Sequence, residues 1–325
     1  MILRSIVLGV FVLAACGPTG SAGDDDDDSA TADSGPANGG ADRIPVTPPN
    51  EFIDAGPQQF CDKMDILFVI DNSGSMSEEQ GNLAANFPLF IEVLDTFQTE
   101  IGSEIDYRVA VTSTGRDMSW TEELLPGFPF PTSQTGENGE LLQRCGMPRR
   151  WLERADPDVA TTFSCAAELG SMGAHIEMPL YAVKLAFDDR IADGTNVGFL
   201  RDDALLAIVI LTDEDDCSRE DDGFTVTGGK TPCDDAEPVG PYKQFLDDTT
   251  GGPGRWAVAV IAGPGPGVCT SSFGSADEAV RLKEIVDLAG DTGVFSSICE
   301  GDLTGALEQA LGTFETACEG FPPIP

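Results

Sequence analysis

The chain has 325 residues, and its 56 Asp and Glu residues against 18 Lys and Arg give a formal net charge of −38. A surface this acidic repels nucleic acid and anionic lipid headgroups, and it attracts divalent cations and basic partners. We therefore expect no nucleic-acid partner. The length allows one large domain or two modest ones, with a sizeable core in either case.

The first residues predict an export signal followed by a lipid anchor. One positive charge, at Arg4, precedes an apolar run that is too short to span a bilayer permanently. The run ends in Leu13 to Cys16, Leu-Ala-Ala-Cys, which resembles the bacterial lipoprotein signal, in which cleavage precedes the Cys and the Cys is acylated. We expect a signal peptide over residues 1–15 and a protein held at the membrane of the cell envelope through Cys16. An ordinary signal peptide before an incidental Cys is the alternative. The residue after Cys16 is Gly17 rather than Asp, and in well-studied envelopes the absence of Asp at this position favours the outer membrane as the location of the lipoprotein.

Residues 16–58 predict a flexible acidic linker behind the lipidated Cys. Gly, Ser, Ala, Pro and Asp dominate this stretch, which includes an unbroken run from Asp24 to Asp28. Such a composition cannot bury enough apolar surface to offset the entropy lost on ordering. We interpret the Asp run as a charge-extended spacer, and a calcium site is the alternative.

From Gln59 onward, the hydrophobic pattern alternates between strands and helices. Strands are predicted where short apolar runs occur, and helices where apolar residues recur every three or four positions. The predicted strands are 65–70, 106–114, 204–213, 255–263 and 294–299, and the predicted helices are 82–97, 177–189, 278–290 and 302–318. This alternation predicts an α/β fold with a doubly wound, mainly parallel sheet flanked by helices, over a domain of residues 59–320 with a tail at 321–325.

Two acids directly follow two of these strands. Asp71 follows the first apolar run and Asp213 follows the most apolar one, and in parallel sheets ligands bind at the carboxyl ends of the strands. Two carboxylates brought together there repel each other and attract a cation. The hydroxyls of Ser73 and Ser75 add neutral oxygens, which makes the set suited to a small, hard ion such as Mg²⁺. Gly74, between the two serines, is expected to relieve backbone crowding in the turn.

The stretch MDILFVIDNSGSMS, with a Thr-Asp after a later apolar strand, resembles the von Willebrand factor type A (vWA) domain. The metal-ion-dependent adhesion site (MIDAS) of that family uses Asp-x-Ser-x-Ser, a Thr from a second loop and an Asp from a third. The resemblance implies that Asp71, Ser73, Ser75 and Asp213 are metal ligands. It also implies a divalent ion, Mg²⁺ first with Mn²⁺ or Ca²⁺ as alternatives, and one open position for a carboxylate of a partner protein.

The Thr element of the family pattern is not matched in this chain. It should precede a helix that lies between the second strand and the strand before Asp213, and GSMGAHIEMPLYAV lies at that place. Ser171 is therefore the candidate ligand, because a Ser keeps the oxygen and loses only the methyl group that fixes the rotamer. Thr161 and Thr162 are the alternatives, unless they lie on a helix surface.

The cysteines predict a disulfide framework. Without Cys16, eight cysteines remain, an even number in an oxidising compartment, and sequence alone permits 105 connectivities. There are no C-x-x-C pairs, which argues against a zinc cluster. Two candidate bridges would close short local loops, one would tie neighbouring strand ends, and one would clasp the termini of the domain. In that order, they are Cys217–Cys233, Cys145–Cys165, Cys269–Cys299 and Cys61–Cys318.

Two long insertions leave the sheet edge that carries the acids. Arg116 to Arg149 contains Trp120, Phe128 and Phe130 among prolines, and Cys217 to Gly240 follows the acidic stretch. One interpretation is that these loops select the partner protein, while the ion makes the same contact with every partner. The other is that they are padding held by disulfides.

An enzyme is the alternative class of function. Phosphatases of the haloacid-dehalogenase-like type also open with a strand that ends in Asp, and they use magnesium, but they need Asp-x-Asp, and Ser73 occupies the second place. The single His175, expected at a helix start, leaves few options for a nucleophilic triad. Asp215 and Asp216 are expected to be exposed loop acids, or else to support an ion. The sequence favours a non-enzymatic, protein-binding adhesion or interaction module, with the phosphatase and a structural lipoprotein without metal as alternatives.

Overall fold

The computed structural model describes residues 61–96, 102, 104–301 and 303–322. The chain divides into two units, Met1–Ala55 and Gly56–Pro325, and all the described residues belong to the second. The predicted signal peptide, Cys16 and the acidic linker therefore lie outside the described residues. Within the described part of the chain, no helix is both long and apolar enough to cross a membrane.

A six-stranded sheet forms the centre of the domain, in the order β11-β8-β6-β1-β2-β5. Neighbouring strands pair in parallel, except that the short β5 runs antiparallel to β2. The strands are β1 (Lys63–Ile70), β2 (Asp106–Ser113), β5 (Leu152–Glu153), β6 (Leu205–Leu211), β8 (Trp256–Ala262) and β11 (Gly293–Ser297). Every residue of β6 and β8 is buried, as expected of strands covered on both faces. The predicted doubly wound, mainly parallel α/β fold is confirmed.

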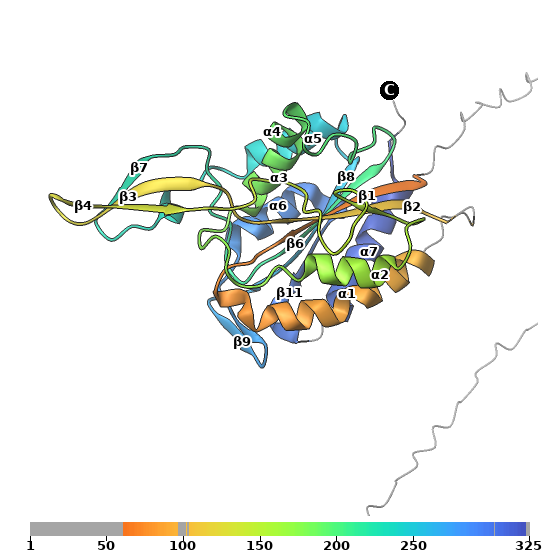
Figure 1. The fold of residues 1–325 in the computed structure, drawn as a ribbon, viewed down its shortest axis with the longest axis horizontal. Helices are drawn as coiled ribbons and strands as arrows, with labels where there is room; N and C mark the ends of the chain where they lie inside the picture. Colours follow the sequence, from red (N-terminus) through yellow and green to blue (C-terminus); the bar gives the residue numbers. More distant parts are fainter. Residues whose placement is uncertain (1–60, 97–101, 103, 302, 323–325) are drawn as a thin grey trace, which may run out of the picture. The chain divides into compact units, whose positions relative to one another are not determined.

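Helices cover both faces of this sheet (Figure 1). On one face lie α1 (Glu79–Thr96), α2 (Val159–Ala167) and α7 (Thr304–Glu319), and on the other lie α3 (Pro179–Phe187), the short α4 (Asp189–Ala192), α5 (Gly240–Thr250) and α6 (Val280–Ala289). Because strand side chains alternate, Phe68 packs with the first layer and Leu67 with the second. The two core clusters hold α1 and α3 on opposite faces of β1, and the turn that follows β1 starts between them.

A packed aromatic group fastens α1 and α2 to the sheet. Phe68 of β1 lies edge-on to Phe87 and Phe90 of α1, with ring centroids 5.6 and 5.1 Å apart, and Phe163 of α2 lies 4.9 Å from Phe68. All four rings are buried, and burying a side chain of this size contributes about 1.5–3 kcal/mol. This packing fixes the direction in which α1 leaves the turn after β1.

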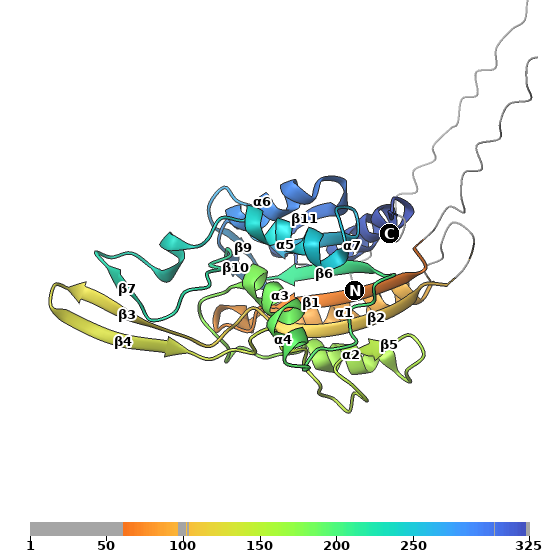
Figure 2. The same cartoon turned by 90° about the horizontal axis from the view of Figure 1, so that it is seen from above.

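The first long insertion forms regular structure where the sequence analysis expected loops. β3 (Met118–Leu125) and β4 (Phe128–Gln134) form an antiparallel hairpin, and β7 (Phe224–Thr227), from the second insertion, pairs in parallel with β3. This three-stranded sheet, called the finger below, projects from the edge where β2 ends (Figures 1 and 2).

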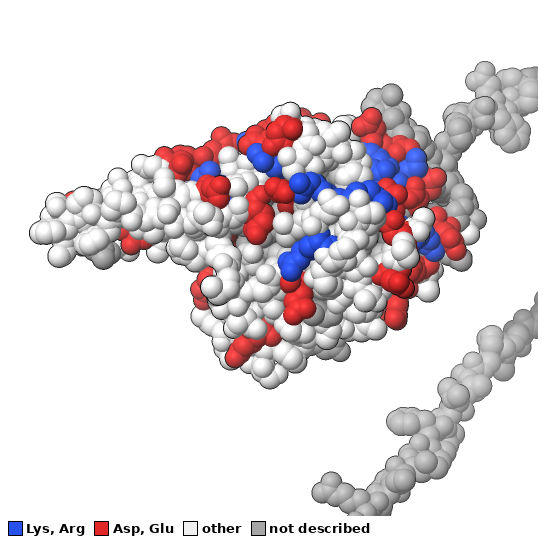
Figure 3. Space-filling model, viewed as in Figure 1, with Lys and Arg blue, Asp and Glu red and all other residues white. Residues whose placement is uncertain are grey.

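The finger is anchored at its base and apolar at its tip. Trp120 is buried at the base and lies parallel to Phe224, whereas Phe128 and Phe130 at the tip are 62% and 53% exposed. In the face that Figure 3 shows, most of the outer finger is free of charged side chains, in contrast to the acidic body behind it.

Four disulfides close the domain, and they are the four pairs that the sequence analysis named. Two of them fasten loops at the carboxyl edge, where η2 (Pro232–Asp235), the hairpin of β9 (Cys269–Ser271) and β10 (Gly274–Ala276), and η4 (Ile298–Glu300) lie. The bridges are Cys61–Cys318, Cys145–Cys165, Cys217–Cys233 and Cys269–Cys299.

Candidate functional site

The turn after β1 is organised by the backbone and side chain of its first residue. The Asp71 N–H donates to the carbonyl of Leu211 at 2.9 Å, which continues the pairing with β6 for one more residue. Oδ1 of Asp71 then accepts the backbone N–H of Ser73 at 2.7 Å, which folds the chain back on itself as an Asx-turn. The buried Met76, inside the 3₁₀ turn η1 (Ser75–Ser77), anchors the start of the helical segment. The turn therefore presents its side chains at the carboxyl edge of the sheet.

Asp213 reaches this turn from the neighbouring strand. The Ser75 hydroxyl lies 3.1 Å from Oδ1 of Asp213, and the Ser73 and Ser75 hydroxyls are 2.8 Å apart. Asp71 and Asp213 are 0% and 2% exposed, whereas Ser75 faces solvent. The four side chains expected to converge at this edge do lie together, and their cluster is open to solvent on the Ser75 side. We call Asp71, Ser73, Ser75 and Asp213 the edge cluster.

The two acids of the edge cluster are poorly compensated. Burial, the largest effect, raises the pKa of Asp71 to about 6 against the opposing hydrogen bonds from Ser73 and Thr212. Burial, followed by repulsion from Asp71, raises the pKa of Asp213 to about 7. None of the ion pairs among the described residues includes either acid. Two buried carboxylates without a cationic partner are the environment in which a divalent ion is favourable.

The oxygens present fit an ion that is held partly by hydroxyls and water. In the described part of the chain, no three His, Cys, Asp or Glu side chains gather closely enough to hold an ion by themselves. The edge cluster offers two carboxylates and two hydroxyls instead, which suits Mg²⁺ because that ion usually keeps several waters. Buried polar atoms without a hydrogen-bond partner also occur in the segments that meet at this edge: Asn72 Oδ1, Glu79 Oε2, Thr114 Oγ1 and both oxygens of Glu177.

The loop of residues 168–178, between α2 and α3, is where the Thr element of the family pattern was expected, and it does pass beside the turn. We call it the third loop below. The Gly173 N–H donates to the carbonyl of Asn72 at 2.7 Å. Ser171, two residues earlier, is half-buried, and among the described residues its hydroxyl has no hydrogen-bond partner. Thr161 and Thr162 lie in α2, as the helix-surface interpretation expected. The structure therefore places the Ser171 loop near the edge cluster and leaves the third ligand unassigned.

Glu177 is an acid at this edge that the sequence analysis did not consider. Its side chain is fully buried. Burial first, then repulsion from Asp71, then the adjacent Glu214 carboxyl raise the pKa of Glu177 to about 11. The signal in the sequence is a single acid in the otherwise mainly apolar segment HIEMPLYAV. The His175 side chain in the same run is exposed.

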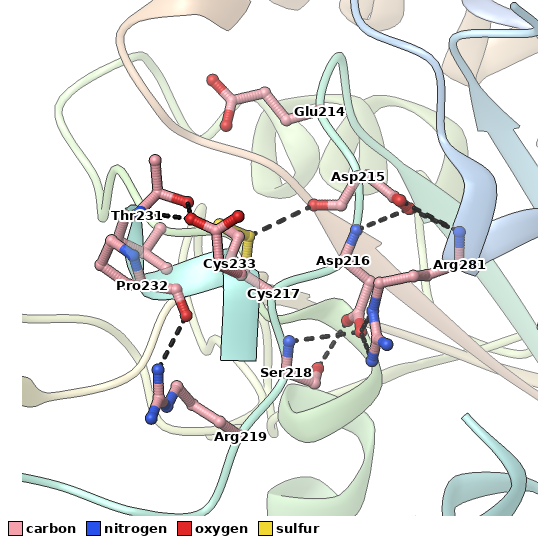
Figure 4. Close-up of a disulfide and its surroundings, with 12 residues drawn as sticks. Glu214, Asp215, Asp216, Cys217, Ser218, Arg219, Thr231, Pro232, Cys233 and Arg281 are labelled. Atoms are coloured by element: carbon pink, nitrogen blue, oxygen red, sulfur yellow. Dashed lines mark hydrogen bonds and ion pairs between the residues drawn. A yellow bond between two sulfur atoms is a disulfide. The ribbon is translucent and has the colours of Figure 1, made fainter. Parts of the chain in front are cut away.

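The acids after Asp213 serve the fold, which corrects their expected role as exposed loop acids. Asp216 is buried and pairs with Arg281 at 3.0 Å (Figure 4). It also accepts the N–H of Leu180 at 3.1 Å. Asp215 accepts the backbone N–H of Arg281 at 3.0 Å, at the start of α6. Beside them, the Cys217–Cys233 bridge holds the following loop to η2. These contacts fix the segment from which Asp213 projects.

Gly74 does not have the role expected of it. Its backbone angles, φ −65° and ψ −28°, are open to any residue, and a Cβ built on it would meet nothing within 4 Å. A tight position lies instead in the third loop, where a Cβ on Gly173 would come within 2.0 Å of Oδ1 of Asn72. The close approach of the Gly173 backbone to the Asn72 side chain therefore favours glycine at position 173, whereas position 74 has room for a larger residue.

Comparisons with known proteins find likeness in structure alone. No family model matches the chain, and no curated protein matches it in sequence. Among solved structures, proximal thread matrix protein 1 from the mussel byssus is 14% identical over 79% of this chain and 47% of that chain, with a TM-score of 0.36. A second structure of that protein, described as having a zinc-occupied MIDAS motif, is 12% identical over 78% of this chain and 49% of that one, with a TM-score of 0.37.

A third similar structure is the human COPII-coat protein Sec24c, at 11% identity over 80% of this chain and 33% of that chain, with a TM-score of 0.41. This chain thus spans half or less of the length of these proteins. At such identities and TM-scores, the likeness says nothing about function. The structure itself defines a doubly wound α/β domain with Asp and Ser side chains gathered at the carboxyl edge of its central sheet.

Proposed function

We propose that this protein is a lipid-anchored, non-enzymatic binding protein of the cell envelope whose vWA-like domain holds a divalent cation at a MIDAS-type site. The ligands are Asp71, Ser73, Ser75 and Asp213, with Ser171 as the sequence candidate for the third loop. The observation that carries the proposal is the 3.1 Å contact between Ser75 and Asp213, which joins two loops around two buried, uncompensated acids.

Magnesium is the first choice of ion, with Mn²⁺ or Ca²⁺ as alternatives. The edge cluster combines few carboxylates with hydroxyls, and hydroxyls add ligand oxygens without adding negative charge. In such a site the ion neutralises Asp71 and Asp213 and keeps one position on the solvent side for an outside ligand.

The outside ligand is proposed to be a carboxylate of a partner protein. Ser75 and Gly74 are exposed, so a partner reaches the ion from this side without displacing any core side chain. The finger projects from the same edge and adds the apolar surface of Phe128 and Phe130 to the contact. The domain is held to the membrane through lipid on Cys16, at the outer membrane, with residues 16–58 as the tether.

The phosphatase alternative lacks its acid–base group. Ser73 stands where that chemistry needs a second Asp, and its hydroxyl is 2.8 Å from Ser75. A structural lipoprotein that binds no metal is the other alternative, and the metal titration below separates it from the proposal.

The test is thermal unfolding of the full-length chain in detergent, with Mg²⁺ or Mn²⁺ and with EDTA. We expect saturating metal to raise Tm by roughly 5–10 °C, since ligand at a hundredfold its Kd adds about 2.7 kcal/mol. Asp71→Ala should abolish the gain, and Asp287→Ala, which removes an exposed acid of α6, should keep it. A gain that is absent from the wild type, or equal in Asp71→Ala, would overturn the proposal.

The partner is tested by pull-down from envelope extract. Wild-type chain should retain a protein with Mg²⁺ and release it with EDTA, and Asp71→Ala should retain none. Retention that is the same with EDTA, or the same in Asp71→Ala, would contradict a metal-bridged contact.

A further inference from the structure

The third loop crosses the carboxyl edge of the sheet and is fastened to three other loops. The Gly173 N–H donates to Asn72 after β1 at 2.7 Å, and the Met178 N–H donates to Thr114 after β2 at 3.0 Å. The carbonyl of Glu177 accepts the Cys217 N–H, after β6, at 2.8 Å. Glu177 is therefore held by backbone contacts between the ends of β2 and β6, at the edge where Asp71 and Asp213 lie.

The side chain of Glu177 is fully buried, and among the described residues no amide, hydroxyl or cationic group donates to its carboxylate oxygens. The only described side chain within hydrogen-bonding reach of it is another acid, Glu214. Its nearest charged neighbours are two further acids, Asp71 and Glu214. None of the described ion pairs includes it. A buried carboxylate without a donor or a cation is among the most unfavourable groups a fold can hold, at several kcal/mol. A buried acid of this kind next to the edge cluster indicates that a cation binds between Glu177 and the neighbouring acids.

We propose that Glu177, rather than Ser171, supplies the third loop's oxygen to the cation through a water molecule of the ion, since these acids do not gather closely enough to hold the ion by themselves. This inference rests on the proposed metal site and changes its composition. Ser171 is half-buried, and no described hydrogen bond directs its hydroxyl to the edge cluster. The backbone on either side of the Glu177–Met178 bond is held in place, because the carbonyl of Glu177 accepts one hydrogen bond and the N–H of Met178 donates another. A third acid beside the ion would strengthen the binding of a divalent cation, and the cation would compensate the carboxylate of Glu177.

The experiment measures Mg²⁺ and Mn²⁺ affinity of the full-length chain by calorimetry, together with Tm in EDTA. Four proteins are compared: wild type, Glu177→Gln, Ser171→Ala and Asp71→Ala. We expect Glu177→Gln to weaken metal binding at least about tenfold. It should also raise Tm in EDTA, because the amide replaces an acid that burial and the neighbouring carboxyl groups destabilise. Ser171→Ala should change the affinity less than about threefold.

The rival explanation is a protonated Glu177 that hydrogen-bonds to Glu214 and never touches an ion. In that case Glu177→Gln keeps a donor and leaves the metal affinity unchanged, and this result would overturn the inference. A loss of affinity in Ser171→Ala that equals the loss in Glu177→Gln would also overturn it. Both outcomes leave the metal site itself standing, provided that Asp71→Ala abolishes binding.

If the proposed metal site does not exist, the result is different: calorimetry then detects no metal binding to wild type or to any of the three variants. Should Glu177→Gln not fold, Glu177→Asp gives a second measurement, since it keeps the charge and shortens its reach by one methylene. Reduced metal affinity with unchanged Tm in EDTA supports the inference, and unchanged affinity overturns it.

Discussion

The hydroxyl of Thr212, the residue directly after β6, donates a 2.7 Å hydrogen bond to Oδ2 of Asp71, the residue directly after β1. The other oxygen of the same carboxylate accepts the Ser73 N–H at 2.7 Å. Thr212 also accepts the Glu214 N–H at 3.1 Å. One buried hydroxyl thus orients the first acid of the edge cluster and the loop that carries the second.

Thr212→Val tests this orienting role. Valine keeps the shape and loses the hydroxyl, so Asp71 loses a donor and the Glu214 N–H loses an acceptor. We expect the free energy of unfolding to fall by about 1–2 kcal/mol and Mg²⁺ affinity to fall roughly tenfold. Thr212→Ser keeps the hydroxyl and should retain most of both. Calorimetric titration measures the Mg²⁺ affinity and urea unfolding measures the stability. Equal values for the two variants would show that the Thr212 hydroxyl does not orient Asp71.

Gly173→Ala and Gly74→Ala are predicted to differ sharply. The added methyl at position 173 meets the buried side chain of Asn72 at 2.0 Å, so either that side chain or the third loop must shift, at about 1–3 kcal/mol of unfolding free energy. The methyl at position 74 has open space and ordinary backbone angles, so stability should stay within about 0.5 kcal/mol or rise slightly. Urea midpoints check both. A destabilised Gly74→Ala would contradict the described turn.

The metal-free domain should lose stability as the pH rises. The folded-state pKa of Asp71 is about 6 against an ordinary value of 3.8, so the unfolded chain releases the proton first. Stability that is present below pH 4 is therefore lost between roughly pH 4 and 6, on the order of 3 kcal/mol from this group.

The matched comparison is urea unfolding in EDTA at pH 5 and pH 7.5, with and without Asp71→Asn. The difference between the two proteins isolates Asp71 from the other carboxyl groups, and the variant should lose less stability over this range. Saturating Mg²⁺ should restore stability most at pH 7.5, because the ion competes with protons. An equal pH dependence in wild type and variant would refute the assignment.

The disulfides should contribute unequally. Cys61–Cys318 closes a loop with a sequence separation of 257, and Cys217–Cys233 one of 16, so loop-closure entropy predicts about 5 against about 3 kcal/mol. Paired Cys→Ser variants, compared by Tm, should rank in this order. In addition, loss of Cys217–Cys233 should lower Mg²⁺ affinity, because that bridge steadies the segment after Asp213, whereas loss of Cys61–Cys318 should not. A reversed ranking would show that strain or residual structure outweighs chain entropy.

The central elements were predictable because their patterns are local. The apolar run before Asp71 and the one before Asp213 are strands buried on both faces, and parallel pairing of Ile70 with Leu211 brings their ends together. α5 was missed because it is largely polar and buries only Tyr242, Leu246 and Asp247. β4 was missed because its prolines argue against a strand, yet it lies at the edge of the finger, where proline is tolerated.

The sequence by itself determined the order of strands and helices, the apolar core and the Asp-x-Ser-x-Ser turn, because each depends on residues a few positions apart. It also indicated that eight cysteines outside the N-terminal segment would pair, and the four pairs named from loop length and strand position are the ones in the structure. Only the tertiary structure decided that Glu177 lies buried beside Asp71, that Asp216 serves Arg281, and that Gly173 needs to be glycine. These features depend on side chains from distant segments meeting at one edge, and the free energy of a buried charge is set by those neighbours rather than by its place in the chain.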